Sequence, residues 1–443
     1  MNNLRIVPLG GGPGMVTNNM YVYLYGNDAL IVDCGIGFPE DKISDDILIP
    51  DITYLKQNQF NIRAVILTHG HDDHYAALPH ILPELNYPPV YASRLTAGFC
   101  QARLKDFDIS HQVTVIKEND QLTLGPFTVF PIHITHSVPD CFHYLIKTPI
   151  GAVYHGSDFK FDLSPIDNWP PNFQKIVSLS KEGILCLLSD CLRSERPGFS
   201  MSESTLAIAI DREMVDCPGR FIFTTMSSQI HRIQQAVDMA VSHNRQVIFI
   251  GRSMEKNAAI AGRLGFLRLP QKSVANKRQL KKIPDHRLCL IIAGSQGQES
   301  SSLTRYASGQ HPLIKVKTTD KVIYSTDIIP GNEQSVYHVI DELSLAGANV
   351  VYGEMGDDLH VSGHGSAEEL KLLMQLVRPK FLYPIGGTFR HARQYQRLAL
   401  NQGFKSQQVI LPQSGQIVDL TPDGRYELKE KLPLKEIRFN QNV

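Results

Sequence analysis

The sequence predicts an α/β protein built from two regions that order their strands and helices differently. Over the first 160 residues, short apolar runs are separated by glycine and aspartate turns, which is typical of successive strands. From about residue 202, helical stretches alternate with apolar strands, and this order indicates a parallel sheet covered by helices. The chain has 443 residues, of which 42% are hydrophobic and 20% charged, so it can bury a large core. This composition excludes a disordered protein and a small disulfide scaffold.

The first region is predicted to contain a hairpin followed by buried strands. Met20–Tyr25 and Ala29–Asp33 bracket the turn Gly26-Asn27-Asp28, a good hairpin signal. Residues 64–68 form a compact apolar run that indicates a fully buried strand, and residues 75–82 can begin a helix after it. We expect further strands at 113–116, 127–130, 142–146 and 152–155.

The second region shows the alternation of strands and helices. Helices are expected at 230–243, 254–264 and 332–346, and strands at 220–224, 246–250, 288–292 and 321–324. Residues 270–284 are basic and rich in turn residues, which predicts an exposed loop. The tail after about Leu420 has no clear core pattern.

Charge and cysteine content limit the classes of protein. The chain holds 44 basic and 44 acidic residues, yet Arg212–Lys321 contains 18 Lys and Arg against seven Asp and Glu, a net charge of +11. This stretch indicates a surface that meets an anion, with an ordinary solvated surface as the alternative. Seven cysteines without a Cys-x-x-Cys pair argue against a disulfide framework or a cysteine-only zinc site. Because neither a membrane span nor a signal peptide is visible, we expect a cytoplasmic protein without membrane association.

The strongest chemical signal is the segment His69-Gly-His71-Asp-Asp73-His74, directly after the strand at 64–68. In a strand-to-helix turn, alternate side chains project to opposite sides of one cavity. His69 and His71 can then serve one metal, and Asp73 and His74 another. Imidazole and carboxylate ligands suit zinc or manganese. The alternative is a histidine-rich surface loop, which the buried strand before the segment and the embedded aspartate disfavour.

Two later residues are candidate ligands of the same centre. His136 lies in Thr135-His-Ser-Val-Pro139 at the end of a strand, and Asp158 lies in Gly156-Ser-Asp158 after the next strand pair. Each alone is more often a turn residue. Their order after the histidine segment favours ligands, and the two carboxylate oxygens of Asp158 suit a bridge between two metals.

These motifs together resemble the metallo-β-lactamase superfamily, whose fold is a four-layer αββα sandwich. Matches from about residue 5 to about residue 420 resemble, more narrowly, the ribonuclease J family; they lie at 49–55, 187–190, 194–199, 230–235, 251–256, 294–297, 329–333 and 360–366. The resemblance implies an inserted β-CASP α/β domain at 206–359, between sandwich segments 1–205 and 360–443. The family's small C-terminal domain is not expected here, which makes a monomer or a weaker dimer the expectation.

The resemblance also implies roles for individual residues. His69, His71 and His136 would hold the first metal, Asp73 and His74 the second, and Asp158 would bridge. Asp190 and His364 match two further active-site motifs, with His364 assisting proton transfer and Asp73 orienting the nucleophile. One or two Zn²⁺ ions are the implied cofactor, with Mn²⁺ or Mg²⁺ as options.

The sequence departs from the family at two glycine-rich places. Where the family has its last zinc-binding histidine, this chain has Gly386, so the second metal is expected to bind more weakly. His391 follows five residues later and would replace that ligand only after a rearrangement. The N-terminal segment Gly10-Gly-Gly-Pro-Gly14 also differs from the usual Gly-Glu-Ile-Gly form.

Two segments are candidates for binding RNA phosphates. Ser228, His231 and Arg232 lie at a strand-to-helix junction, and Ser362, His364 and Ser366 lie in a Gly/Ser-rich turn. By the resemblance they line a 5′-monophosphate pocket; for the serines, turn and cap chemistry is the alternative. The expected partner is single-stranded RNA, preferably 5′-monophosphorylated, with a homodimer or association with other RNA-decay proteins as options.

Three functions remain open from the sequence. The first is a metal-dependent ribonuclease in RNA processing and decay, a 5′-to-3′ exonuclease with endonuclease activity as an option. The second is an RNA-binding paralogue with impaired catalysis, suggested by Gly386. The third is a metallohydrolase of another substrate, such as a thioester or lactone, for which a large basic insert is superfluous.

Overall fold

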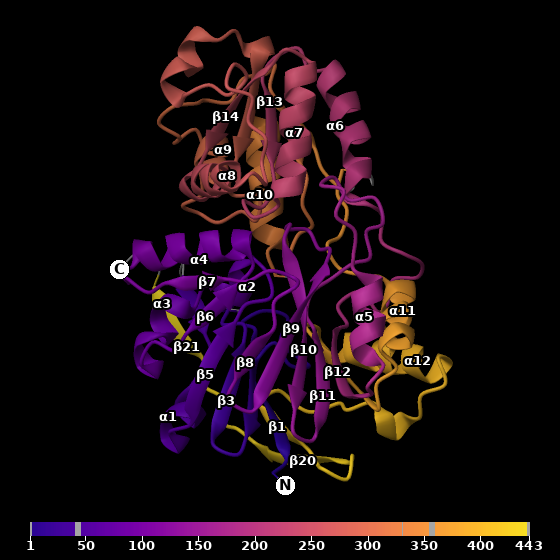
Figure 1. Ribbon diagram of the computed structural model, residues 1–443. Helices are drawn as coiled ribbons and strands as arrows, with labels where there is room; N and C mark the ends of the chain where they lie inside the picture. Colours follow the sequence, from indigo (N-terminus) through magenta and orange to yellow (C-terminus); the bar gives the residue numbers. More distant parts are fainter. Residues whose placement is uncertain (1, 40–45, 330, 354–358, 441–443) are drawn as a thin grey trace. The chain divides into compact units, whose positions relative to one another are not determined.

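The computed structural model describes residues 2–39, 46–329, 331–353 and 359–440 (Figure 1). The chain forms two compact units. The first contains the residues up to Leu163, then Pro170–Ser200, and the residues from Gly363 on; the second contains Ser164–Trp169 and Met201–Ser362. Within the sequence motif at 329–333, Pro330 lies outside the described residues. The domain limits drawn from the resemblance stay a prediction.

The first unit contains an eight-stranded sheet in the order β20-β19-β1-β2-β3-β5-β6-β7. Its strands are β1 (Leu4–Gly10), β2 (Met20–Tyr25), β3 (Asp28–Val32), β5 (Asn61–Ile66), β6 (Val90–Ala92), β7 (Val113–Val115), β19 (Gln416–Leu420) and β20 (Tyr426–Lys431). The predicted hairpin is confirmed, because β2 and β3 pair antiparallel across the expected turn. β3, β5, β6 and β7 then run parallel, so their carboxyl ends share one edge.

A six-stranded sheet, in the order β18-β12-β11-β10-β9-β8, faces the first. Its strands are β8 (Leu122–Leu124), β9 (Phe127–Ile134), β10 (Cys141–Thr148), β11 (Gly151–Gly156), β12 (Ile184–Asp190) and β18 (Phe381–Ile385). Apolar side chains from both sheets, such as Tyr23, Ile66, Tyr144 and Leu188, form one buried core between them. The last strands, β11, β12 and β18, are parallel to one another.

Helices cover the outer faces of the paired sheets (Figure 1). On one side lie α1 (Thr53–Asn58), α2 (Asp72–Tyr75), α3 (Leu78–Ile81) and α4 (Arg94–Asp106), and on the other α5 (Phe173–Ser180), α11 (Ala367–Val377) and α12 (Phe389–Asn401). A small antiparallel ribbon joins β4 (Asp46–Ile49) to β21 (Ile437–Asn440). The expected αββα sandwich is therefore present.

The second unit is a five-stranded, wholly parallel sheet in the order β14-β15-β13-β16-β17. Its strands are β13 (Phe221–Thr224), β14 (Gln246–Ile250), β15 (Leu288–Ile292), β16 (Lys321–Tyr324) and β17 (Asn349–Val351). Its helices are α6 (Leu206–Val215), α7 (Ile230–Ser242), α8 (Arg252–Leu264), α9 (Ser302–Ala307) and α10 (Glu333–Leu345). The unit has its own apolar core, as the βαβ alternation predicts.

Local differences from the sequence predictions are small. The segment 270–284 contains a short 3-10 helix, Lys277–Lys282, because Leu280 is buried and holds the segment against the core. The tail after Leu420 forms β20 and β21, whose side chains are mostly exposed. Further 3-10 turns lie at Pro83–Leu85, Glu203–Thr205, Asp285–Arg287 and Ser406–Gln408. Across the described parts of the chain, every helix is too short or too polar to cross a membrane.

Candidate metal centre

The predicted ligands come together where several parallel strands of the first unit end. Thr68 and His69 follow β5, Asp158 follows β11, and Asp190 is the last residue of β12. His136 follows β9 from the neighbouring strands of the second sheet. In the turn between β5 and α2, Gly70 is required by close packing, because a Cβ there would lie 2.8 Å from the ring of Phe99. The turn therefore brings His69, His71 and His74 close to His136 and Asp158.

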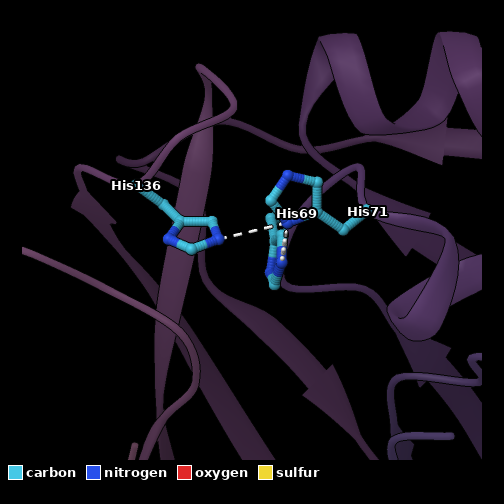
Figure 2. A group of neighbouring side chains, drawn as sticks. All are labelled: His69, His71 and His136. Carbon is cyan, nitrogen blue, oxygen red and sulfur yellow. Dashed lines mark hydrogen bonds between the residues drawn. The ribbon is translucent and has the colours of Figure 1, made fainter. Parts of the chain in front are cut away.

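His69, His71 and His136 form the first set of donors, which we call the imidazole group (Figure 2). His71 Nδ1 lies 3.1 Å from His69 Nε2 and 3.1 Å from His136 Nε2. Nitrogen ligands at the usual zinc distances in a tetrahedron are about 3.3 Å apart. His71 Nδ1 thus already lies at about this spacing from the other two nitrogens, and all three atoms lie within 4.8 Å of one another.

Hydrogen bonds fix which nitrogen of each ring faces the centre. His136 Nδ1 donates to the carbonyl oxygen of Gly363 at 2.7 Å, so Nε2 carries the free lone pair. His69 Nδ1 lies 3.0 Å from the hydroxyl oxygen of Thr68, which leaves its Nε2 free in the same way. His71 has the reverse arrangement, because its Nε2 lies 3.2 Å from Ser137 Oγ and its Nδ1 faces the other two rings.

The imidazole group is electrically neutral at pH 7. Burial lowers the pKa of His69 and of His136 well below the usual value, and it lowers the pKa of His71 to about 4. Neighbouring histidines lower the pKa of His69 and of His136 further. Because unprotonated imidazole is the form that binds metals, these three rings are ready for a divalent cation.

Asp73, His74 and Asp158 form a second set of donors, which we call the mixed group. His74 Nε2 lies 3.3 Å from Asp158 Oδ2 and 3.5 Å from Asp73 Oδ2. Asp158 Oδ2 is also 3.9 Å from His69 Nε2, so this carboxylate lies between the two groups. The predicted bridging role of Asp158 is consistent with this place.

The mixed group attracts positive charge, unlike the imidazole group. Burial alone would lower the pKa of His74, but the charges of Asp73, Asp158 and Asp33 outweigh it and raise the pKa well above the usual value. Burial would raise the pKa of Asp158, yet His74 and His364 hold it well below its usual value. A carboxylate-rich site that favours a proton on its histidine also favours a metal cation there.

Two residues of this centre were not found from the sequence. Asp33 accepts a 2.7 Å hydrogen bond from His74 Nδ1 and is itself held by the backbone N–H and the hydroxyl of Thr68. Asn19 places its amide nitrogen 3.1 Å from His74 Nε2 and 3.3 Å from Asp73 Oδ2. The sequence signal that could have identified Asp33 is its position as a carboxylate directly after the apolar run 29–32. For Asn19, the only signal is its position directly before the predicted strand at 20–25.

Asp190 and His364 form a pair beside the bridging carboxylate. His364 Nδ1 donates to Asp190 Oδ2 at 2.7 Å, and His364 Nε2 lies 4.0 Å from Asp158 Oδ2. Burial would lower the pKa of His364, but Asp190 and Asp158 raise it to about 9. The imidazolium form of His364 can therefore present a proton at Nε2 toward the centre.

Gly386 faces the centre without contributing a side chain. A Cβ at this position would lie 3.6 Å from Asp158 Oδ1 and 3.7 Å from Asp190 Oδ1. His391 is committed elsewhere: its Nδ1 accepts from the backbone N–H of Thr388 at the start of α12, and its Nε2 lies 3.7 Å from Glu195 Oε2. His391 therefore caps its own helix, and no rearrangement toward Gly386 is seen.

The predicted phosphate-binding residues are divided between the two units. Ser228, His231, Arg232 and Ser362 belong to the second unit, and His364 and Ser366 to the first. His231 Nε2 lies 3.1 Å from Asp167 Oδ2, and Ser228 is partly exposed. Ser366 is buried and caps α11 in a capping box with Glu369, the alternative that turn chemistry had offered.

Arg232 has a different role from the one predicted. Its side chain is 0% exposed, and its guanidinium nitrogens donate to both carboxylate oxygens of Glu203 and to the carbonyl oxygens of Ser325 and Val361. A phosphate cannot replace these partners without opening the core of the second unit. Arg232 thus forms a buried ion pair with Glu203, and the structure contradicts a phosphate contact by its guanidinium group.

The donor set fits divalent metal ions. Three triads of closely spaced donors occur among the described residues: His69, His71 and His136; His69, His74 and Asp158; and His136, Asp158 and His364. Imidazole nitrogens and carboxylate oxygens are ligands for zinc, and the carboxylates also suit manganese or magnesium. Asp73 and Asn19 lie beside the second triad, at the distances given above.

Comparisons with known proteins agree with this architecture. The model of the metallo-β-lactamase superfamily matches residues 13–170, and that of the ribonuclease J β-CASP domain matches residues 218–343. A crystal structure of a protein of unknown function from Enterococcus faecalis V583 covers 94% of this chain with a TM-score of 0.62. That protein is 15% identical and covered over its whole length, so the likeness concerns the fold alone.

Relatives of known name share much more sequence. Ribonuclease J of Helicobacter pylori (strain ATCC 700392 / 26695) is 37% identical over 95% of this chain, which spans 61% of that protein's length. Ribonuclease J of Thermus thermophilus is also 37% identical over 95% of the chain, and here the match spans 74% of the relative. On this similarity, and with both domain models matched, the chain belongs to the ribonuclease J family.

Proposed function

We propose that this chain is a metal-dependent ribonuclease that hydrolyses RNA phosphodiester bonds. The observation that carries the proposal is the pair of donor groups that share Asp158, since two neighbouring metals are suited to the in-line displacement at a phosphodiester. Membership of the ribonuclease J family supports RNA as the substrate. The basic stretch Arg212–Lys321 supports a polyanionic partner.

The residues of the chain would divide the work. His69, His71 and His136 would hold one ion and Asp73 and His74 the other, with Asp158 between them. When bound, the ions would activate water and neutralise charge on the phosphate; we propose Zn²⁺, with Mn²⁺ or Mg²⁺ as substitutes. Asp73 would orient the attacking water, and His364, held by Asp190, would give its Nε2 proton to the departing oxygen.

We further propose that the enzyme is a 5′-to-3′ exonuclease that prefers single-stranded, 5′-monophosphorylated RNA, with endonucleolytic cuts as a second mode. Ser228, His231, Ser362, His364 and Ser366 remain the proposed contacts of the terminal phosphate. Arg232 is withdrawn from this set because its nitrogens are bonded inside the second unit. RNA processing and decay are the processes in which such an activity would serve.

The test is cleavage of a 3′-labelled RNA by purified protein supplied with zinc or manganese. Substrates with a 5′-monophosphate and a 5′-triphosphate are compared, and His71→Ala is run beside His338→Ala, an exposed histidine on α10. We expect shortening from the 5′ end that favours the monophosphate, vanishes in His71→Ala and persists in His338→Ala. Equal cleavage by His71→Ala would refute the metal-dependent mechanism.

Gly386 favours a second candidate, an RNA-binding paralogue with impaired catalysis. Its lack of a side chain removes one ligand that the family places beside Asp158. Binding of the same RNA without cleavage at any metal concentration would support this candidate and exclude the enzyme.

A further inference from the structure

Asn19 is held rigidly against the mixed group. Its backbone N–H donates to the carbonyl oxygen of Asp73 at 3.0 Å, and its own carbonyl oxygen accepts from Gly35 at 2.9 Å. The side chain is 3% exposed. Asn19 therefore reaches the centre from a fixed piece of backbone, immediately before β2.

The Asn19 amide lies close to two predicted ligands of the second metal. The terminal Nδ2 atom of Asn19 lies 3.1 Å from His74 Nε2 and 3.3 Å from Asp73 Oδ2. His74 Nε2 in turn lies 3.5 Å from Asp73 Oδ2 and 3.3 Å from Asp158 Oδ2. Ligands of a tetrahedral zinc ion are about 3.3 Å apart. The separations of His74 Nε2 from Asn19 Nδ2, Asp73 Oδ2 and Asp158 Oδ2 are thus close to those between two ligands of one cation.

We propose that Asn19 is a ligand of the second metal through Oδ1 and replaces the ligand that Gly386 lacks. Turning the amide by 180° exchanges Oδ1 and Nδ2 without changing its shape. Two neighbours of this position, Asp73 O and Asp73 Oδ2, are acceptors. Without a metal, an NH₂ group satisfies them; with a cation among them, a carbonyl oxygen is the favoured neighbour.

The N-terminal glycine segment makes room for this arrangement. A Cβ on Gly11 would clash with Asn19 Oδ1, so a larger residue would exclude the amide. Gly11 O accepts from Gly386 N–H, and Gly14 N–H donates to Gly387 O, each at 2.9 Å. The two places where the sequence departs from its family therefore lie against each other, beside Asn19.

The metal preference of the two groups should differ as a result. With Asn19, the mixed group offers three oxygen atoms and one nitrogen, whereas the imidazole group offers three nitrogens. Oxygen-rich sites suit Mn²⁺ and Mg²⁺ better than imidazole sites do. We therefore expect Mn²⁺ to displace zinc from the mixed group first.

The proposal rests on the metal-dependent function but is tested by metal content, which does not require RNA cleavage. The full chain is loaded with Zn²⁺, dialysed against metal-free buffer, and its zinc measured for wild type, Asn19→Ala, Asn19→Asp and His71→Ala. Aspartate keeps the size of asparagine and can ligate, but it cannot donate a hydrogen bond to Asp73. Circular dichroism and the ion retained by the imidazole group report whether each variant is folded.

We expect two ions in wild type and Asn19→Asp and one in Asn19→Ala, with zinc affinity at the mixed group lowered by more than roughly 100-fold. His71→Ala should lose the other ion. One ion in wild type or two ions in Asn19→Ala would overturn the proposal. One ion in both Asn19→Ala and Asn19→Asp would also overturn it, because asparagine would then act only as a hydrogen-bond donor and not as a ligand. If Asn19→Ala does not fold, Asn19→Ser, too short to reach the cation, takes its place.

Discussion

The imidazole group and the mixed group lie side by side but are built in opposite ways. The imidazole group consists of three neutral rings, of which two are buried and that of His71 is half-buried, and two of them come from one turn of the chain. The mixed group combines two carboxylates with a histidine whose pKa is raised, and it depends on Asp33 and Asn19 from distant segments. The comparison teaches that one group is prepared by burial, whereas the other is prepared by charge and needs a cation to balance it.

The largest effect is expected at Asp158, the residue that the two groups share. Asp158→Ala removes an oxygen near His69, His74 and His364 together. Because bound metals supply several kcal/mol of transition-state stabilisation, we expect RNA cleavage to fall by at least about 10³-fold. Zinc analysis should show both ions weakened; loss of one ion alone would contradict a bridging role.

Asp190→Asn should lower activity and leave both groups loaded. Its carboxylate stabilises protonated His364, so its loss lowers the pKa of His364 from about 9. The protonated fraction then falls at a lower pH, and the alkaline decline of the rate moves toward neutrality. A general acid contributes roughly 10²–10⁴-fold, and we expect about 100-fold here. A pH–rate profile with zinc analysis checks this; an unmoved alkaline limb would remove His364 as the acid.

Asp33→Asn should affect the mixed group more than the imidazole group. Asp33 accepts from His74 Nδ1, and replacing such a partner typically weakens a metal site by about 10–100-fold. Competition with a chelator measures the affinity of each ion separately. Equal weakening of both ions would mean that Asp33 supports the whole centre and that the two groups are not independent.

The smallest effect is expected at Thr68, whose hydroxyl contacts His69 of the imidazole group and Asp33, the carboxylate that supports His74 of the mixed group. Its oxygen lies 2.8 Å from Asp33 Oδ2 and 3.0 Å from His69 Nδ1. Thr68→Val keeps the shape but leaves two buried polar groups short of a partner, which costs about 1–3 kcal/mol of unfolding free energy. Chemical denaturation of the metal-free and metal-loaded chain measures it. If only one of the two ions binds more weakly in Thr68→Val, its identity shows whether the hydrogen bond to Asp33 or the one to His69 supports metal binding.

The sequence predicted the centre best where ligands are close together in the chain. The segment 69–74 combined a buried strand with four donors in six residues, and that pattern survives in any fold that keeps the strand. Asp33 and Asn19 act only because β2, β3 and β5 are neighbours, which no local pattern reveals. The αββα sandwich and the roles of Asp190 and His364 were predicted from the family resemblance. Hydrophobic periodicity alone predicted only a region of successive strands and a region with a parallel sheet covered by helices.

The errors have physical causes of the same kind. Arg232 was predicted to meet phosphate because an arginine near a helix start suggests an anion site. Its true partner, Glu203, lies 29 residues away and is buried with it. Leu280 was likewise hidden in a basic segment, and β20 and β21 lack the alternation that marks a half-buried strand.

The place of Gly363 has a consequence for how the centre is assembled during synthesis. His136 is oriented by the carbonyl oxygen of Gly363, which follows the long excursion Met201–Ser362. At ribosomal rates of about 5–20 residues per second, the excursion takes on the order of ten seconds to emerge. During that interval the histidines of the nascent chain lack the hydrogen bond that sets the tautomer of His136. A metal that binds earlier would therefore bind before His136 has its hydrogen bond to Gly363. The site can reach its final geometry only after the residues of the second unit have been synthesised.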